Sequence, residues 1–314
     1  MRASTPVSAG KFCYYRISGL RVQSDIPLYG SIEDEERVAA PDISVRLGRV
    51  PDSLEGAVSV GPNWQFAPSR FLVEVPGVVR FLVTSGTDIL VEPVSGVSLD
   101  DAAIFIVGTA IAVALYQRGA LILHASAVSA RGGAFAFSGA SGAGKSTLAA
   151  LLCLDGGCEM LSDDVSCIDL GGERPMLKAD GRRFRLWEDV IDWLDVTEHR
   201  RKAVRSMIQK FHVELPAHRP EIELPLRAIY VLDTLPEGTE PVVEPLPAGR
   251  AAFALDHHRY RRRLANQINE VSQRFALMAR LVDRVPVFIF HRPVAVADNE
   301  RSVACLKAHW DSLA

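Results

Sequence analysis

Residues 139–146 read GASGAGKS, a complete match to the phosphate-binding pattern G-x-x-x-x-G-K-[ST]. An apolar run of strand length, residues 134–137, precedes this stretch, and a strong helix opening, residues 147–152, follows it. A phosphate loop needs this context, because the first turn of the helix supplies free N–H groups and the positive end of its dipole. Residues 139–146, hereafter the phosphate loop, therefore predict an α/β core that binds a nucleoside triphosphate with Mg²⁺. The alternative interpretation is a Gly/Ser-rich turn between two core elements.

Each type of residue in the phosphate loop has its own predicted role. The glycines permit a tight, positive-φ backbone, so that successive N–H groups can point at phosphate oxygens. Lys145 can reach the β- and γ-phosphates as a point charge, and the Ser146 hydroxyl can ligate Mg²⁺. The predicted nucleotide-binding residues are Gly139, Ala140, Ser141, Gly142, Ala143, Gly144, Lys145, Ser146 and Thr147.

The composition is that of an ordinary globular protein. The 314 residues are 48% hydrophobic and 23% charged, and the length suffices for two domains. A formal net charge of −3 provides no long-range attraction to nucleic acid or to an anionic membrane, so neither partner is expected. The five cysteines form no CxxC pair and the N-terminus has no apolar signal-peptide core, so we expect reduced thiols in the cytoplasm.

The pattern of short apolar segments predicts two domains. Residues 1–98 are rich in strand formers, and segments at Arg70–Val75, 78–84 and 88–91 lie at hairpin spacing. Residues 99–314 alternate strands with helices, which is typical of an α/β domain.

Three further segments have a clear local prediction. The apolar run 102–115 is shorter than the ~20 residues that span a bilayer and predicts a buried helix. The Pro-rich stretch 236–247 predicts a loop. Residues 256–283 predict one or two amphipathic helices.

A nucleotide loop needs an acidic partner, and the first candidate is Asp163-Asp164. The pair lies about 17 residues after the loop, at the end of a predicted strand. Adjacent side chains on extended backbone point in opposite directions unless a bend intervenes, so the two carboxylates can differ in role. One can coordinate Mg²⁺ and the other can accept a proton from an attacking hydroxyl. The alternatives are a helix or turn cap, or plain solvated acids.

A second candidate acid is Asp233, which ends the apolar run 228–232 as in an ordinary Walker B strand. That pattern would suit a transport or mechanical ATPase, but we favour the alternative, a core strand that ends at a loop. The sequence contains no LSGGQ-like stretch and no TKxD or NKxD motif, which argues against a transporter ATPase and a GTPase.

Several stretches together resemble the HPr kinase/phosphorylase superfamily. The main ones are LHASAV at 123–128, the loop GASGAGKST, and LSDDV at 161–165. In such kinases a histidine precedes the loop by about fifteen residues and a doubled aspartate follows it. Weaker likeness covers most of the chain, in YYRISGL, QRGALILHA, RLWEDV and VPVFIFHRP. The chain is most similar to the HPr-kinase-like serine kinases of bacterial peptide-modification clusters, including lasso-peptide precursor kinases.

This resemblance implies a fold and a set of roles. The fold would be an HPr-kinase/phosphoenolpyruvate-carboxykinase-like α/β core with a β-rich N-terminal domain. The loop would bind ATP, and Mg²⁺ would lie at Ser146 and Asp164. Asp163 would be the base that takes the proton from the substrate serine, and Lys145 would act on the phosphates. His124 would lie beside the site, although a satisfied core histidine is an equal alternative.

The sequence departs from authentic HPr kinases at two points. The glutamate that often follows the loop serine is Thr147 here, and no stretch resembles the IEIRGLG signature. These departures favour the lasso-type branch over HPr as the substrate. The implied activity is an ATP-dependent serine kinase that acts on a peptide or small protein. The alternatives are a small-molecule kinase of the same fold and a nucleotide-binding regulator that transfers no phosphate. HPr kinases form homo-oligomers, and the motifs do not determine whether this chain does so.

Two basic stretches are candidates for holding phosphate or an acidic peptide tail. They are Arg182-Arg183-Phe184-Arg185 and the run from Arg259 to Arg263. For each stretch taken singly, a solvated face of a helix is the interpretation that we favour.

Overall fold

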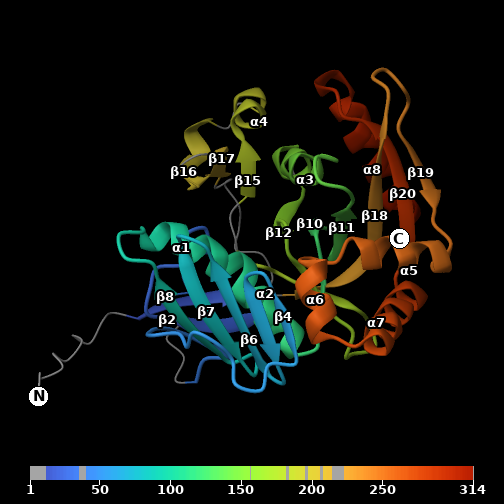
Figure 1. Ribbon diagram of the computed structural model, residues 1–314. Helices are drawn as coiled ribbons and strands as arrows, with labels where there is room; N and C mark the ends of the chain where they lie inside the picture. The colour runs from blue at the N-terminus through green and yellow to red at the C-terminus, as the bar shows by residue number, and fades with distance from the viewer. Residues whose placement is uncertain are drawn as a thin grey trace, which may run out of the picture. The chain divides into compact units, whose positions relative to one another are not determined.

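The computed structural model describes residues 12–34, 40–155, 157–181, 184–194, 197–205, 208–213 and 223–313 (Figure 1). The chain divides into two compact units, the first ending at Ala114 and the second beginning at Leu115, except that Ile17–Gly19 group with the second. The sequence-based boundary at 98/99 differs from this division by the helical residues 99–114, which belong to the first unit.

The first unit is built on an eight-stranded sheet, which runs from blue to cyan in Figure 1. Its strand order is β1 (Cys13–Ile17), β2 (Leu20–Ser24), β3 (Ile43–Leu47), β8 (Asp88–Pro93), β7 (Val79–Thr84), β6 (Arg70–Val75), β5 (Trp64–Ala67) and β4 (Ser59–Gly61). Strands β6, β7 and β8 pair antiparallel in succession, which confirms the predicted hairpins.

A continuous helical stretch, Leu99–Gln117, follows the sheet. It consists of α1 (Leu99–Phe105), a π-helical turn (Ile106–Ala110) and α2 (Ile111–Gln117). The hydroxyl of Ser98 accepts from the N–H of Asp100 and caps its N-terminus. The stretch is long and apolar enough to cross a membrane, but 72% of its most apolar window is buried within the fold. The prediction of a buried helix is confirmed.

The second unit is built on a nine-stranded sheet. The main path is β12 (Glu159–Ser162), β10 (Ala125–Ala130), β11 (Gly133–Ser138), β18 (Glu223–Leu235), β14 (Met176–Lys178), β13 (Ser166–Asp169) and β9 (Leu121–Leu123); β20 (Val287–Pro293) pairs with β18, and β19 (Val242–Pro245) pairs with β20. Strands β11, β18 and β20 are parallel neighbours, so their carboxyl ends lie at the same edge of the sheet.

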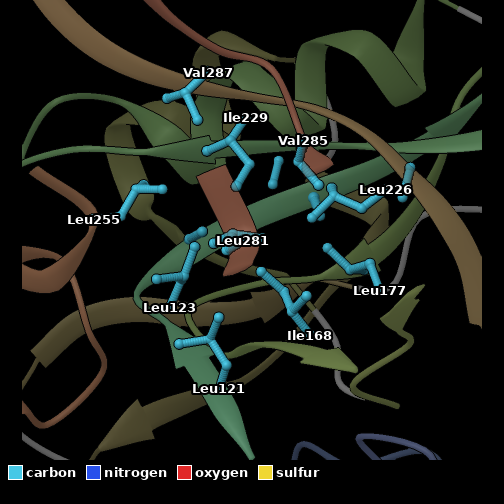
Figure 2. Close-up of a cluster of buried hydrophobic side chains, with 14 of the residues drawn as sticks. Leu121, Leu123, Ile168, Leu177, Leu226, Ile229, Leu255, Leu281, Val285 and Val287 are labelled. Carbon is cyan, nitrogen blue, oxygen red and sulfur yellow. The ribbon is translucent and has the colours of Figure 1, made fainter. Parts of the chain in front are cut away.

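The side chains of β11 alternate between two hydrophobic clusters. Phe135 and Phe137 belong to a cluster with residues of α3 (Lys145–Leu154) and α8 (Asn299–Ser312). Ala134 and Ala136 belong to a second cluster, with α5 (Ala248–His257) and α7 (Val271–Arg284). Figure 2 shows part of the second cluster, including Ile229 of β18. Because alternate side chains of a strand point to opposite faces, helices cover both faces of the sheet.

The remaining elements of the second unit are short. A three-stranded sheet has the order β15 (Phe184–Trp187), β17 (Ile208–Val213) and β16 (Arg200–Arg205), and the helical pieces are α4 (Glu188–Trp193), α6 (Arg262–Ile268) and the 3₁₀ turns Thr197–His199 and Val296–Asp298.

The α/β class and the β-rich N-terminal unit agree with the sequence, but two local predictions need correction. The predicted loop 236–247 contains β19, and the helices predicted from 256 begin earlier, with α5 at Ala248. An edge strand tolerates proline, because proline has no N–H to donate to a neighbouring strand. Pro245 lies in β19, which pairs on one side with β20.

Candidate functional site

The phosphate loop joins the end of β11 to the start of α3, so the strand and the helix that the motif requires are both present. Gly142 and Gly144 adopt φ values of +86° and +80°, which side-chain-bearing residues rarely adopt. Gly144 is the N-cap of α3, and as a glycine it has no side chain with which to cap the helix. The N–H groups of the first turn lack intrahelical acceptors, so the end of α3 suits an anion.

Lys145 is the first residue of α3 and is only 7% exposed. Its Nζ donates hydrogen bonds to the carbonyls of Gly139 at 3.0 Å and Ala140 at 2.9 Å. A cation at a helix N-terminus opposes the helix dipole. The carbonyls of Gly139 and Ala140 hold the ammonium near the first-turn N–H groups of α3. A phosphate bound at this end of the helix would contact the ammonium and the N–H groups together.

Asp163 is buried, with 1% of its surface exposed, and both of its carboxylate oxygens accept hydrogen bonds. Its Oδ1 accepts from the Ser146 hydroxyl at 2.6 Å and from the Ser126 hydroxyl at 2.9 Å. Its Oδ2 accepts from the backbone N–H of Arg185 at 3.0 Å. The structure therefore joins the loop serine to the first aspartate of the predicted pair.

Asp164 adopts φ +82°, an uncommon backbone conformation for a non-glycine residue. Its Oδ1 lies 2.9 Å from Nδ1 of His124, and its Oδ2 lies 2.5 Å from Nη2 of Arg185. Burial alone would raise the pKa of Asp164, but the charge of Arg185 and the contact with His124 outweigh it and hold the pKa well below its usual range. The side chain keeps 22% of its surface exposed.

The bend at Asp164 changes the geometry expected for an extended strand. Both carboxylates reach the same residue, because Arg185 donates its backbone N–H to Asp163 and its guanidinium to Asp164. Asp163 and Asp164 raise the pKa of Arg185 although burial opposes this. The pair is thus one connected acid site beside the loop.

The competing acid, Asp233, is differently engaged. Its Oδ2 lies 2.8 Å from Nδ1 of His291 on β20, and its side chain is 59% exposed. The hydroxyl of Ser146 contacts Asp163 instead.

Other residues join the site without a recognised sequence signal. Asp180 is fully buried, and its Oδ2 accepts from the N–H of Asp163 at 3.0 Å. The carbonyl of His258 accepts from the N–H of His124 at 2.7 Å. This hydrogen bond places the end of α5 beside His124. Burial, followed by the charges of Lys145 and His124, lowers the pKa of His258. Ser126 could have been noticed as one of two serines, with Ser129, in a strand whose other residues are apolar.

The two predicted basic stretches have different outcomes. Arg185 pairs with Asp164, whereas Arg182 and Arg183 lie outside the described residues. Arg259 and Arg262 both contact the carboxylate of Asp256, at 2.8 Å and 3.2 Å.

The residues present fit a nucleoside triphosphate with Mg²⁺. Mg²⁺ prefers oxygen ligands and is usually held by one or two carboxylates together with substrate phosphates. Ser146 and Asp163 offer such oxygens beside the start of α3. No cluster of three or more His, Cys, Asp or Glu side chains suited to a metal occurs in the described part of the chain.

Replacing Gly144 with alanine should destabilise the fold and weaken nucleotide binding. A left-handed backbone costs an alanine about 1–2 kcal/mol, and its Cβ would also lie 2.4 Å from Nη2 of Arg292. Gly132→Ala is the matched control, because Gly132 has φ +69° and a Cβ added there would meet nothing within 4 Å. The end of the Arg292 side chain would have to shift within its buried site. Urea denaturation should give a larger loss for Gly144→Ala, and equal losses would contradict this prediction by showing that the guanidinium moves aside at little cost.

The lowered pKa of Asp164 predicts an acid-dependent part of stability. A carboxylate whose folded pKa is depressed stabilises the fold above its unfolded pKa of about 3.9, and this contribution is lost as the pH falls through the folded value. The difference in unfolding free energy between wild type and Asp164→Asn should therefore shrink from about pH 4 downwards. Urea denaturation across this range measures it, and a difference that does not change with pH would contradict the depressed pKa.

Comparisons with known proteins find similarity among solved structures. No protein-family model and no curated protein matches the chain. The structure of the HPr(Ser) kinase/phosphatase from Coxiella burnetii aligns with 61% of this chain and 97% of its own, at 11% identity and a TM-score of 0.32. A likeness at this level identifies neither a family nor an acceptor nor an activity.

Proposed function

We propose that the chain is an ATP-dependent kinase that transfers the γ-phosphate to a serine hydroxyl of a peptide or small protein. The observation that carries this proposal is the contact between Ser146 and Asp163, which joins the phosphate loop to an acid pair. A loop alone would support nucleotide binding only. An adjacent carboxylate that stays ionised adds a group able to accept the proton of an attacking hydroxyl.

The division of roles within the acid pair follows from the contacts of each carboxylate. Sequence resemblance assigned the base to Asp163 and the metal to Asp164. We propose the opposite. Asp163 contacts the hydroxyl expected to ligate Mg²⁺, and donors occupy both of its oxygens. Asp164 is partly exposed and is oriented by His124 and Arg185, so an acceptor hydroxyl has access to it.

Phosphoryl transfer depends mainly on positioning and on charge neutralisation. The first-turn N–H groups of α3 and the ammonium of Lys145 would bind the phosphate oxygens. Neutralisation of charge on the β- and γ-phosphates is what Mg²⁺ supplies when bound at Ser146 and Asp163. Asp164 would accept the proton of the serine hydroxyl, and its contacts with His124 and Arg185 hold the carboxylate in place.

The acceptor class rests on sequence resemblance. The order LHASAV, phosphate loop and LSDDV is similar to lasso-peptide precursor kinases, and the IEIRGLG signature of HPr kinases is missing. We therefore propose a lasso-type precursor peptide as the acceptor and the cytoplasm as the place of reaction. The proposal leaves the oligomeric state undetermined. Sedimentation of the purified protein measures whether it forms a homo-oligomer.

The experiment is transfer of labelled γ-phosphate to the precursor peptide encoded beside this gene. Label in a serine of the peptide supports the kinase, and a Ser→Ala peptide is the control. Label in a metabolite extract but not in peptide supports the small-molecule kinase. Nucleotide binding without any labelled acceptor, or release of free phosphate alone, contradicts the kinase and favours the regulator or an ATPase.

A further inference from the structure

Arg292, near the end of β20, is a buried cation with weak contacts. It is 2% exposed. Its Nη2 lies 3.4 Å from the carbonyl oxygen of Gly144, its Nη1 lies 3.4 Å from Oδ1 of Asn299, and its Nε has no hydrogen-bond partner. Within the described parts of the chain, no carboxylate lies within ion-pair distance of this guanidinium.

Such an arrangement does not stabilise folding. Moving a charge out of water costs several kcal/mol unless a partner of opposite charge and good hydrogen bonds compensate. Two long bonds to neutral oxygens compensate poorly. Burial lowers the pKa of Arg292 to about 10, which still leaves the guanidinium charged at neutral pH.

Arg292 places a positive charge against Gly144 of the phosphate loop. The side chain shares a strand face with Phe290, which packs in the cluster with α3 and α8. A Cβ on Gly144 would lie 2.4 Å from Nη2, so the guanidinium lies directly against the glycine that caps α3. Asn299 is the first residue of α8, so the guanidinium contacts the positive ends of two helices.

The acid that precedes Asn299 in the chain is engaged with other groups. Asp298, the N-cap of α8, accepts from the N–H of Gly238 and pairs with Arg301. Among the described residues, Arg292 therefore carries its charge next to Gly144 with no carboxylate partner of its own.

We propose that Arg292 is a positioning residue of the nucleotide site, whose counterion is the bound polyphosphate. Its guanidinium contacts the carbonyl of Gly144 and so helps to hold the backbone of the loop in place. Its charge adds positive potential at the start of α3. The ligand class is an anion with at least two linked phosphates. This inference rests on the proposed function, because it requires that the phosphate loop binds such an anion.

The test uses Arg292→Met, which removes the charge at similar volume, and titrates ATP and inorganic pyrophosphate by calorimetry. Loss of the positive charge beside Gly144 should weaken binding of both ligands by about 10- to 100-fold. Thermal unfolding of the ligand-free variant should occur at the wild-type temperature or above, because a buried unpaired charge has been removed. Arg292→Lys keeps a charge and should bind more tightly than Arg292→Met.

The matched control is Arg280→Met. Arg280 also donates to a backbone carbonyl, that of Leu170 at 2.8 Å, but it lies on α7. Arg280→Met should leave the affinities for ATP and for pyrophosphate unchanged.

A purely structural role has the opposite signature. Arg292→Met would then unfold at a lower temperature, or fail to fold, while any folded variant would bind as wild type does; either result overturns the inference. A Lys variant as weak as the Met variant would contradict the role of charge. If the wild-type protein binds neither ATP nor pyrophosphate, the proposed nucleotide site itself is contradicted. If wild type binds both and Arg292→Met binds equally well, only the inference about Arg292 fails.

Discussion

Lys145→Ala is expected to lose both nucleotide binding and phosphate transfer. The ammonium is nearly buried against the loop carbonyls of Gly139 and Ala140, where it would meet the phosphates. Loss of a charge-assisted hydrogen bond should lower ATP affinity by about 10- to 100-fold. Loss of a charge that acts on the transferred group should lower the transfer rate by a further ~10²–10³-fold. Calorimetry with ATP and single-turnover transfer to the peptide measure the two effects separately.

The control for this prediction is Lys307→Ala on α8. Lys307 pairs with the exposed Asp155, which caps the opposite end of α3 from the loop, and such surface pairs contribute little. It should bind and transfer as wild type does. Wild-type ATP affinity in Lys145→Ala would mean that the loop does not hold the phosphates.

Asp164→Asn is expected to abolish most of the transfer while ATP binding stays nearly unchanged. Asparagine keeps the size of the side chain but cannot accept a proton, and general-base catalysis contributes ~10²–10⁴-fold in typical enzymes. Single-turnover transfer at saturating ATP and Mg²⁺ measures the loss. Because the substitution removes the anionic partner of Arg185, thermal unfolding must show that the variant is folded at the assay temperature.

Asp163→Asn distinguishes the two carboxylates. Asp163 contacts the Ser146 hydroxyl, so its replacement should raise the Mg²⁺ concentration required for transfer, with part of the rate restored at high Mg²⁺. The opposite pattern would be a lost rate in Asp163→Asn at every Mg²⁺ concentration and a raised Mg²⁺ requirement in Asp164→Asn. That result would restore the division expected from sequence resemblance.

Most local structure of the site could be predicted from sequence because it depends on neighbours in the chain. The glycine spacing, the apolar residues before Gly139 and the helix formers after Ser146 predicted a strand, a loop and a helix that are present. The hairpins of the first unit followed from alternation and turn residues in the same way. The strand β19 was missed, because its pairing with β20 is a long-range contact that a proline-rich sequence does not indicate.

The sequence by itself determined which residues could do chemistry: a phosphate loop, a histidine before it and two aspartates after it. Only the tertiary structure decided how they meet. The positive φ of Asp164 turns both carboxylates toward Arg185, and strand pairing brings Ser126 to Asp163 and Arg292 to Gly144. These contacts join residues far apart in the chain, so they depend on sheet register and packing, which no local pattern encodes. Local spacing therefore specified the loop, and packing specified which acid contacts its serine.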